Sequence, residues 1–154
     1  VKNGSLLSIF TNGTWDPVFD GIVYGEFDTY PKRWIAGSDY HRRTQNPPGG
    51  TDETADPDTL IQMAIVYDAA NNIRIYRNGE LYSSYNKGSL QTYSAGVSNG
   101  VCFGIRLYYH NSPQGWVSAR ITEARIYREA LSRLQIQGLR SESDRPRGTV
   151  VMIR

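Results

Sequence analysis

The chain has 154 residues, of which 39% are hydrophobic, and this is enough for one domain with a single core. Its 17 basic and 15 acidic residues leave a formal net charge of +2, which argues against the strongly basic surface typical of nucleic-acid-binding domains. The sequence has no apolar run of 18 or more residues, so we expect no membrane-spanning helix.

Short strands joined by turns are the expected elements along most of the chain. The 11 tyrosines suit pleated surfaces, and the 15 glycines suit turns, so the composition favours an all-β fold. The single cysteine, Cys102, lies in an apolar run and cannot form an intrachain disulfide. In chain order, we expect strands at residues 5–10, 21–24, 33–36, 40–44, 60–67, 73–77, 80–83, 101–108 and 115–127.

The long segment before the central strands, residues 44–58, has no periodicity and contains three prolines, two glycines and four carboxylates. Segments of this length in a compact domain are often functional or disordered. A solvated loop is the favoured interpretation, and a binding lid is the alternative.

The clearest strand signal lies in residues 61–77. Side chains alternate through Ile61, Met63, Ile65 and Tyr67, and the alternation resumes at Ile73 after a polar break. The dipeptide that follows, at positions 78–79, is Asn-Gly, which readily adopts the two positive φ angles of a type I′ turn. The sequence therefore predicts an antiparallel β-hairpin here.

A long strand is expected to run directly into a helix near the end of the chain. The alternation of residues 115–127 slips by one position at Thr122-Glu123, where a β-bulge would restore the register. Ser132 is the expected N-cap of the helix, with Gln135 completing a capping box. Leu131 and Ile136 can then form a hydrophobic staple, and Gly138 is expected to end the helix.

The C-terminal residues are expected to lie outside the main domain, which we place at residues 1–139. Residues 140–148 are charged and have no apolar face, so they suggest a linker or surface loop. The last apolar run, residues 149–153, can add one strand or pair outside the domain.

Two segments, AIVYD…NIRIYRNGELY and CFGIRLYY…GWVSARITEARIYREALSRLQI, resemble the laminin-G-like domains of the concanavalin-A-like lectin and glucanase superfamily. The resemblance covers residues 60–136 and implies a two-sheet antiparallel jelly-roll sandwich with one short C-terminal helix. In that family one or two earlier strands normally precede the position where this chain starts. We therefore expect the chain to be part of a longer protein and to pack against the rest of that parent or a partner subunit.

The stretch FDGIVYGEFDTYPKRWIAGSDYHRRTQ, residues 19–45, also resembles a variety of this domain attached to large exported bacterial proteins with haem-binding segments. This similarity implies an exported protein, in the periplasm, at the cell surface or outside the cell. The haem-attachment sequence C-x-x-C-H does not occur in this chain.

A catalytic role is not expected. Glycoside hydrolases of related jelly rolls place three carboxylates alternately along one strand, whereas here Glu26 and Asp28 are followed by Thr29-Tyr30-Pro31. The two histidines, His41 and His110, have no neighbouring nucleophile motif and no zinc-ligand spacing. We therefore expect a non-enzymatic module.

Calcium is the one metal that the resemblance implies, because laminin-G-like domains often hold it at the rim of the sandwich. Carboxylates are usual among calcium ligands. Thr122 stands where the family has an acidic residue, which weakens the case, and turn-forming aspartates are the alternative interpretation. The candidate ligands are Asp16, Asp20, Asp39 and Asp68.

Two clusters suit sugar binding, because aromatic faces stack on sugar rings while planar polar groups bond hydroxyls. Arginine in the first cluster would favour an acidic or sulfated glycan. Core packing is the alternative for many of these rings, and Trp34, Tyr76 and Tyr127 are expected in the core. The first cluster contains Arg33, Tyr40, His41, Arg42 and Arg43, and the second contains Tyr108, Tyr109, His110, Asn111, Gln114 and Trp116.

We therefore expect a recognition module of a larger exported protein, with carbohydrate as its ligand. A structural module that packs against protein is the second possibility, and a glycan-active hydrolase the third. Nucleic acid and membrane are not expected partners.

Overall fold

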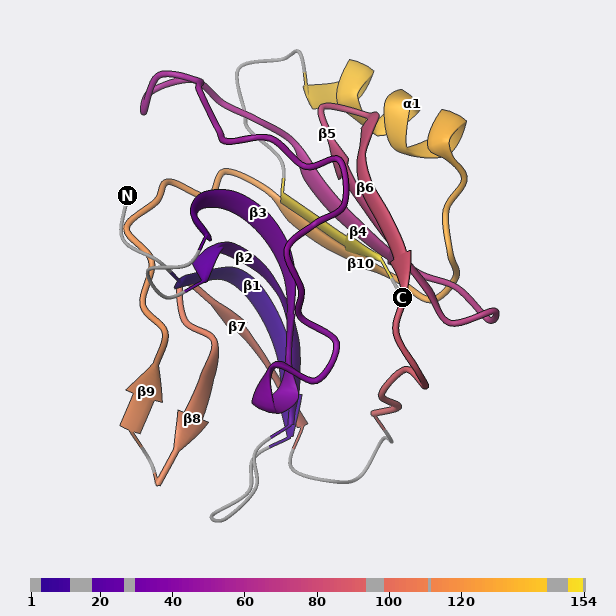
Figure 1. The fold of residues 1–154 in the computed structure, drawn as a ribbon. Helices are drawn as coiled ribbons and strands as arrows, with labels where there is room; N and C mark the ends of the chain where they lie inside the picture. Colours follow the sequence, from indigo (N-terminus) through magenta and orange to yellow (C-terminus); the bar gives the residue numbers. More distant parts are fainter. Residues whose placement is uncertain are drawn as a thin grey trace.

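The computed structural model describes residues 4–11, 18–26, 30–93, 99–110, 112–143 and 150–153. Two sheets stack face to face, and one helix covers the outside of one sheet (Figure 1). The predicted all-β sandwich with a short C-terminal helix is confirmed. No helix of the described residues is long and apolar enough to cross a membrane.

The first sheet has four antiparallel strands in the order β3-β2-β1-β7. Between β3 and the next strand the chain makes one turn of 3-10 helix, η1 (Asp39–His41), and the long loop of residues 44–58. The strands are β1 (Gly4–Thr11), β2 (Phe19–Glu26), β3 (Tyr30–Ser38) and β7 (Asn99–Phe103).

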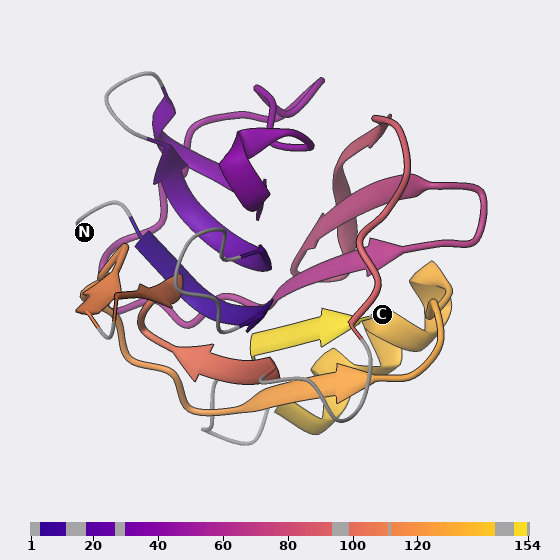
Figure 2. The same cartoon turned by 90° about the horizontal axis from the view of Figure 1, so that it is seen from below.

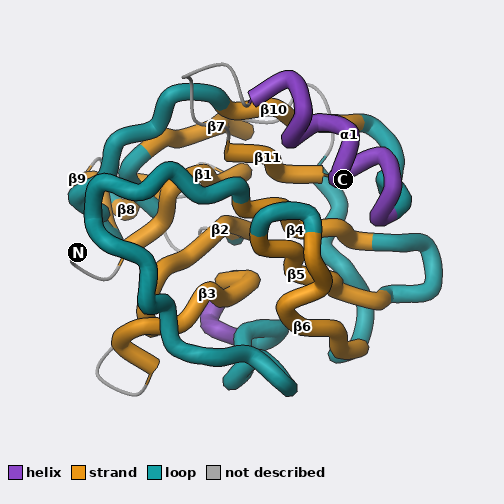
Figure 3. Tube along the Cα trace, turned by 90° about the horizontal axis from the view of Figure 1, so that it is seen from above, coloured by secondary structure: helices purple, strands orange, loops and turns teal. Residues whose placement is uncertain are grey.

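The second sheet has five strands in the order β10-β11-β4-β5-β6, and its C-terminal strand β11 runs parallel to both neighbours. Seen from above, the edge strands β7 and β10 lie on one side of the sandwich, and β3 and β6 lie on the other (Figure 3). The strands are β4 (Met63–Tyr67), β5 (Asn72–Arg77), β6 (Glu80–Asn86), β10 (Ala124–Tyr127) and β11 (Val150–Ile153).

The main core lies between the sheets and is formed by the alternating side chains of both. Leu7 and Ile22 from one sheet and Met63, Ile65 and Ile73 from the other are fully buried. Trp34, which the sequence predicted in the core, is 6% exposed and packs there too. The period-two pattern of the strands therefore places one side chain in two at the interface.

The helix α1 (Arg133–Ser143) covers the outer face of the five-stranded sheet (Figure 2). Its Ile136 is completely buried and packs with Leu131, Val66 and Tyr76. Tyr127 is half-buried against the same cluster, as expected.

Two local predictions are confirmed in detail. Asn78 and Gly79 have φ values of 53° and 77°, as the type I′ turn between β5 and β6 requires. At the helix start, the Ser132 N–H donates to Gln135 Oε1 at 2.8 Å, and the Gln135 N–H donates to Ser132 Oγ at 3.3 Å. The capping box therefore forms as predicted.

Residues 40–44 do not form the predicted strand. Tyr40 and His41 have positive φ values of 40° and 57°, which bend the chain into η1. Ser38 Oγ accepts from the Arg43 N–H, and Thr44 Oγ1 accepts from the Ser38 N–H. These local bonds replace the ladder bonds that a strand would need.

The predicted strands at residues 101–108 and 115–127 are also shorter than expected. The first divides at Gly104, where φ is 76°, into β7 and β8 (Leu107–Tyr109), and β8 pairs with β9 (Ser112–Gln114). The second is a strand only from Ala124 onward, because its neighbour β11 begins opposite that residue. The expected β-bulge at Thr122-Glu123 is therefore wrong.

The C-terminal prediction is corrected as well. Helix α1 continues through Gly138 to Ser143, so residues 140–143 are helical and not linker. Gly138 does not have the positive φ with which a glycine commonly ends a helix. Of the two alternatives for the final segment, the structure shows the strand, since β11 lies inside the sheet between β10 and β4.

Candidate functional site

The hairpin β8–β9 lies beside the four-stranded sheet and projects away from it (Figure 1). Large aromatic side chains on this hairpin and directly after it are exposed to solvent. Tyr108 is 38% exposed, Tyr109 is 40% exposed and Trp116 is 61% exposed. We call this surface, formed by Tyr108, Tyr109, His110, Gln114 and Trp116, the aromatic hairpin. Five residues of the second predicted sugar-binding cluster therefore lie on this hairpin or directly after it, and Asn111 of that cluster lies outside the described residues.

The backbone of the aromatic hairpin is firmly anchored. The Arg106 N–H donates to the Gln114 carbonyl at 2.8 Å, and the Val117 N–H donates to the Gly104 carbonyl at 3.0 Å. A Cβ added at Gly4 would lie 2.2 Å from the Trp116 carbonyl oxygen, so only glycine allows β1 to approach this closely. The Trp116 ring is therefore exposed on a backbone that is held in place.

The rings of the aromatic hairpin are oriented by their neighbours. The centroids of Tyr108 and Phe10 are 6.1 Å apart, and Tyr109 meets the edge of the His110 ring at 4.2 Å. His110 occupies the turn with a positive φ of 47°. Gln114 is half-buried, and its side-chain amide donates to the Ser112 carbonyl at 3.5 Å. Exposed rings beside an amide can stack on a sugar and bond its hydroxyls.

The first predicted cluster is largely engaged in bonds within the protein. Arg33 donates to Asp52 at 3.2 Å and to Asn46 at 2.5 Å. Arg43 is buried and donates to Asp20 at 2.5 Å, so its guanidinium cannot reach a ligand at the surface. These two arginines therefore hold the fold together.

The remaining members of that cluster lie at η1. Tyr40 is 58% exposed, and the Arg42 guanidinium lies 5.6 Å from its ring centroid. Burial and the charge of Arg106 both lower the pKa of His41 below 6.5. Arg106 lies at the base of the aromatic hairpin. Its positive charge therefore acts on His41, which belongs to the first predicted cluster.

The predicted calcium ligands do not come together in the described part of the chain. Asp20 is 1% exposed and bonded to Arg43, and Asp39 is buried at the start of η1. Asp68 accepts from the Ala70 and Asn72 amides and pairs with Arg74, as a turn-forming aspartate does. Asp16 lies outside the described residues, and among those described no three His, Cys, Asp or Glu side chains cluster.

A groove of about 410 Å³ opens between the sheets, at a place that the sequence did not single out. Its floor is formed by Leu6, Tyr24 and Trp34. The ring centroids of Tyr24 and Trp34 lie 4.8 Å apart. One wall comes from residues 55–61 and the other from residues 117–122. One sequence feature lay close to this groove, namely the long loop of residues 44–58. The end of that loop and the residues that follow it form the first wall.

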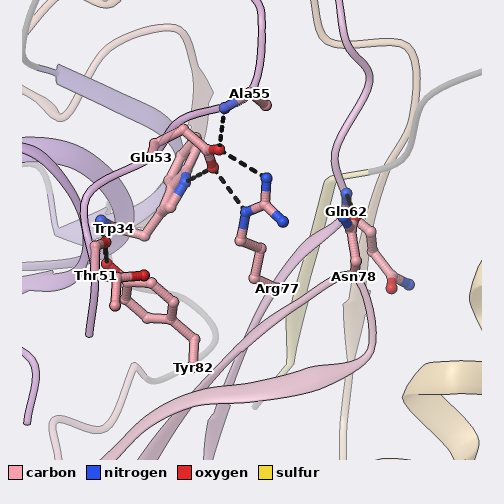
Figure 4. A network of polar contacts seen from close by, with 8 residues as sticks. All are labelled: Trp34, Thr51, Glu53, Ala55, Gln62, Arg77, Asn78 and Tyr82. Atoms are coloured by element: carbon pink, nitrogen blue, oxygen red, sulfur yellow. Dashed lines mark hydrogen bonds and ion pairs between the residues drawn. The ribbon is translucent and has the colours of Figure 1, made fainter. Parts of the chain in front are cut away.

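Glu53 fastens that first wall to both sheets (Figure 4). Its carboxylate accepts from Trp34 Nε1 at 2.7 Å, from Arg77 at 2.7 and 2.8 Å, and from the Ala55 N–H at 2.9 Å. These bonds overcome the effect of burial and lower the pKa of Glu53 to about 2. Glu53 therefore anchors the loop at one position, while most residues from 48 to 60 are exposed, as in the solvated loop that the sequence favoured.

The two carboxylates considered for hydrolysis, Glu26 and Asp28, fall on parts of the chain whose side chains the structure does not describe. Glu53, Asp56 and Asp58 are the acidic residues that line the groove, and the Glu53 carboxylate accepts hydrogen bonds from Trp34, Ala55 and Arg77.

Comparison with known families agrees with the two-sheet architecture. A laminin G model, described as concanavalin A-like lectin/glucanases superfamily, matches residues 8–137. No curated protein and no solved structure matches the chain. Since the family model spans most of the chain, this protein belongs to the concanavalin A-like lectin/glucanase superfamily.

Proposed function

We propose that this domain is a non-catalytic recognition module that binds carbohydrate on the aromatic hairpin. The observation that carries the proposal is the position of Trp116, whose ring is 61% exposed while its backbone is packed against Gly4. A rigid, exposed ring loses little entropy when a sugar stacks on it.

Family membership supports a carbohydrate ligand, because the superfamily includes lectins. Fold alone is weak evidence for function, so the exposed rings of Tyr109 and Trp116 carry more weight. An acidic or sulfated glycan has less support than the sequence suggested, since Arg33 and Arg43 are engaged within the protein. The resemblance of residues 19–45 to domains of exported bacterial proteins supports a location outside the cytoplasm.

The test is a screen of the full chain against neutral, acidic and sulfated glycans, first with calcium and then with a chelator. We expect Trp116→Ala and Tyr109→Ala to lower affinity about tenfold or more with the fold unchanged. Leu81→Ala is the matched control, because Leu81 is 51% exposed on the distant strand β6. Absence of binding across the array would contradict the proposal, and loss of binding with chelator would restore the case for calcium.

A structural packing module is the second candidate, and the edge strands favour it. Val101 and Phe103 on β7 are 46% and 56% exposed, and Ile126 on β10 is 44% exposed. Apolar side chains on the neighbouring edges of two sheets are typical of a surface that another chain covers. Stable association with a protein that survives Trp116→Ala, together with a silent glycan array, would favour this candidate.

A further inference from the structure

We propose that the open edge of strand β6 pairs with the same strand of a second copy of this chain, so that two five-stranded sheets join into one continuous sheet. The inference is independent of the glycan proposal, because β6 and the aromatic hairpin belong to different sheets. It starts from the strands that lie at the edges of the sandwich, which are β3, β7, β10 and β6 (Figure 3).

Strand β3 is the longest of these edge strands, but the long loop already covers its outer side. The Trp34 N–H donates to the Tyr82 hydroxyl at 3.4 Å. The Lys32 carbonyl accepts from the Glu53 N–H at 2.8 Å. Among the other three, β6 has seven residues, whereas β7 has five and β10 has four. The longest open edge in the described part of the chain is therefore that of β6.

The bonds of β5 show which backbone groups of β6 face outward. The Asp68 N–H donates to the Asn72 carbonyl at 3.1 Å, so Asn72 faces β4 and the next residue, Ile73, faces β6. Tyr85 lies opposite Ile73 and faces it in return. The preceding residue, Ser84, therefore directs its N–H and C=O away from β5. Neither group bonds to another described segment of the chain.

Strand β6 lacks the features that usually protect an edge strand from pairing. Its residues 81–86 include no charged side chain and no proline. Ser84 and Asn86 are both exposed, so another chain can approach the edge at these positions. An open edge without charges or proline is the kind that recruits a further strand.

The charges at the two ends of β6 favour a second copy in antiparallel orientation. The strand begins with Glu80, and Lys87 follows its last residue. The Glu80 side chain is 63% exposed even though it pairs with Arg133, so a further cation can reach it. Antiparallel pairing brings the Glu80 end of each copy beside the Lys87 end of the other, whereas parallel pairing would bring like charges together. The edge is therefore complementary in charge to itself.

The outward-facing groups also specify the register. A two-fold axis perpendicular to the joined sheet requires one residue of β6 to lie opposite its own equivalent. With Ser84 in that position, each Ser84 N–H donates to the Ser84 carbonyl of the other copy. The same register places Asn86 opposite Tyr82 of the second copy, so the ladder extends on both sides of the axis.

Sedimentation equilibrium of the full chain, over about a hundredfold range of concentration, measures the dissociation constant of the dimer. Ser84→Pro removes the outward N–H and keeps the bonds to β5, so this constant should rise about tenfold or more. Ser84→Ala is the matched control, because it keeps the N–H, and its constant should stay within about twofold. Thermal unfolding of both variants checks that each is folded.

Exchanging charges at the same position tests the register without altering the backbone. Ser84→Lys and Ser84→Glu each place like charges opposite one another across the axis, so each variant alone should dimerise about fivefold more weakly or worse. An equimolar mixture of the two should dimerise more strongly than either variant alone, because lysine then faces glutamate.

Three results would overturn the proposal. A chain that stays monomeric at the highest concentration would point instead to a strand of a different protein as the occupant of this edge. A dimer that a folded Ser84→Pro variant does not weaken would have to form elsewhere on the surface. A mixture of Ser84→Lys and Ser84→Glu that dimerises no better than the separate variants would exclude the pairing of Ser84 with its own equivalent.

Discussion

Glu53 and Arg77 form an ion pair with two hydrogen bonds, at 2.7 and 2.8 Å, that joins the loop of residues 44–58 to strand β5. The Glu53 side chain is 9% exposed, so this pair is more protected from solvent than most surface ion pairs. It also orients the Trp34 ring through the bond to Nε1 at 2.7 Å. The pair therefore connects the stability of the loop to the shape of the groove.

Acid should weaken the fold through Glu53. Its pKa is about 2 in the folded protein against an ordinary value of 4.5, so its contribution to stability is complete above about pH 4.5 and is lost as the pH falls toward 2. We expect about 2–3 kcal/mol from this group. Urea unfolding from pH 6 to 3 measures it, and Glu53→Gln should flatten the profile. The exposed Glu129→Gln is the control, and equal profiles for both variants would contradict the assignment.

Arg43→Met should destabilise the protein by about 3–5 kcal/mol, because it leaves the carboxylate of Asp20 buried without its partner. Arg42→Met, at the next position, should cost about 1 kcal/mol or less, since Arg42 is exposed and contacts the ring of Tyr40. Denaturant unfolding of both variants gives the comparison. Similar losses at the two positions would show that the buried pair is not important for stability.

His41 should titrate below its ordinary value of 6.5, because burial and the Arg106 guanidinium disfavour its charged form. The lowered pKa means that the unfolded chain binds this proton more tightly, so stability should fall as the pH drops below about 6.5. The ring resonances followed by NMR from pH 8 to 5 give the midpoint. A midpoint at or above 6.5 would contradict the effect of the half-buried position of His41 and of Arg106. Arg106→Gln should raise the midpoint.

Ser132→Ala should lower the free energy of unfolding by about 1 kcal/mol, because it removes the acceptor for the Gln135 N–H at the start of α1. Thermal unfolding of this variant is compared with Ser112→Ala, which changes an exposed serine of β9 outside the helix. An effect of the same size in both variants would mean that the capping box contributes nothing specific.

Local sequence predicted those elements whose geometry depends on near neighbours. The Asn78-Gly79 turn follows from the tolerance of those two residues for positive φ, and the helix start follows from Ser132 and Gln135. The alternation of residues 61–67 correctly placed Met63 and Ile65 in the core. Each of these features involves residues fewer than about ten positions apart.

Strand ends were less predictable, because a strand exists only where it has a neighbour. Residues 115–123 have strand periodicity, yet only residues from Ala124 onward pair, since β11 starts opposite that position. The rings of Tyr108, Tyr109 and Trp116 were predicted as a cluster, and the structure places the two tyrosines on the β8–β9 hairpin and Trp116 just after it, with all three exposed.

The sequence by itself therefore determined the fold class, the central hairpin, the helix cap and the aromatic segment of this protein. Tertiary structure alone decided that Arg43 turns inward to Asp20, that Glu53 joins the loop to Arg77, and that a groove opens beside β11. The physical reason is distance along the chain. Burial and ion pairing depend on which residues meet in space, and these partners lie 23 and 24 positions apart in sequence.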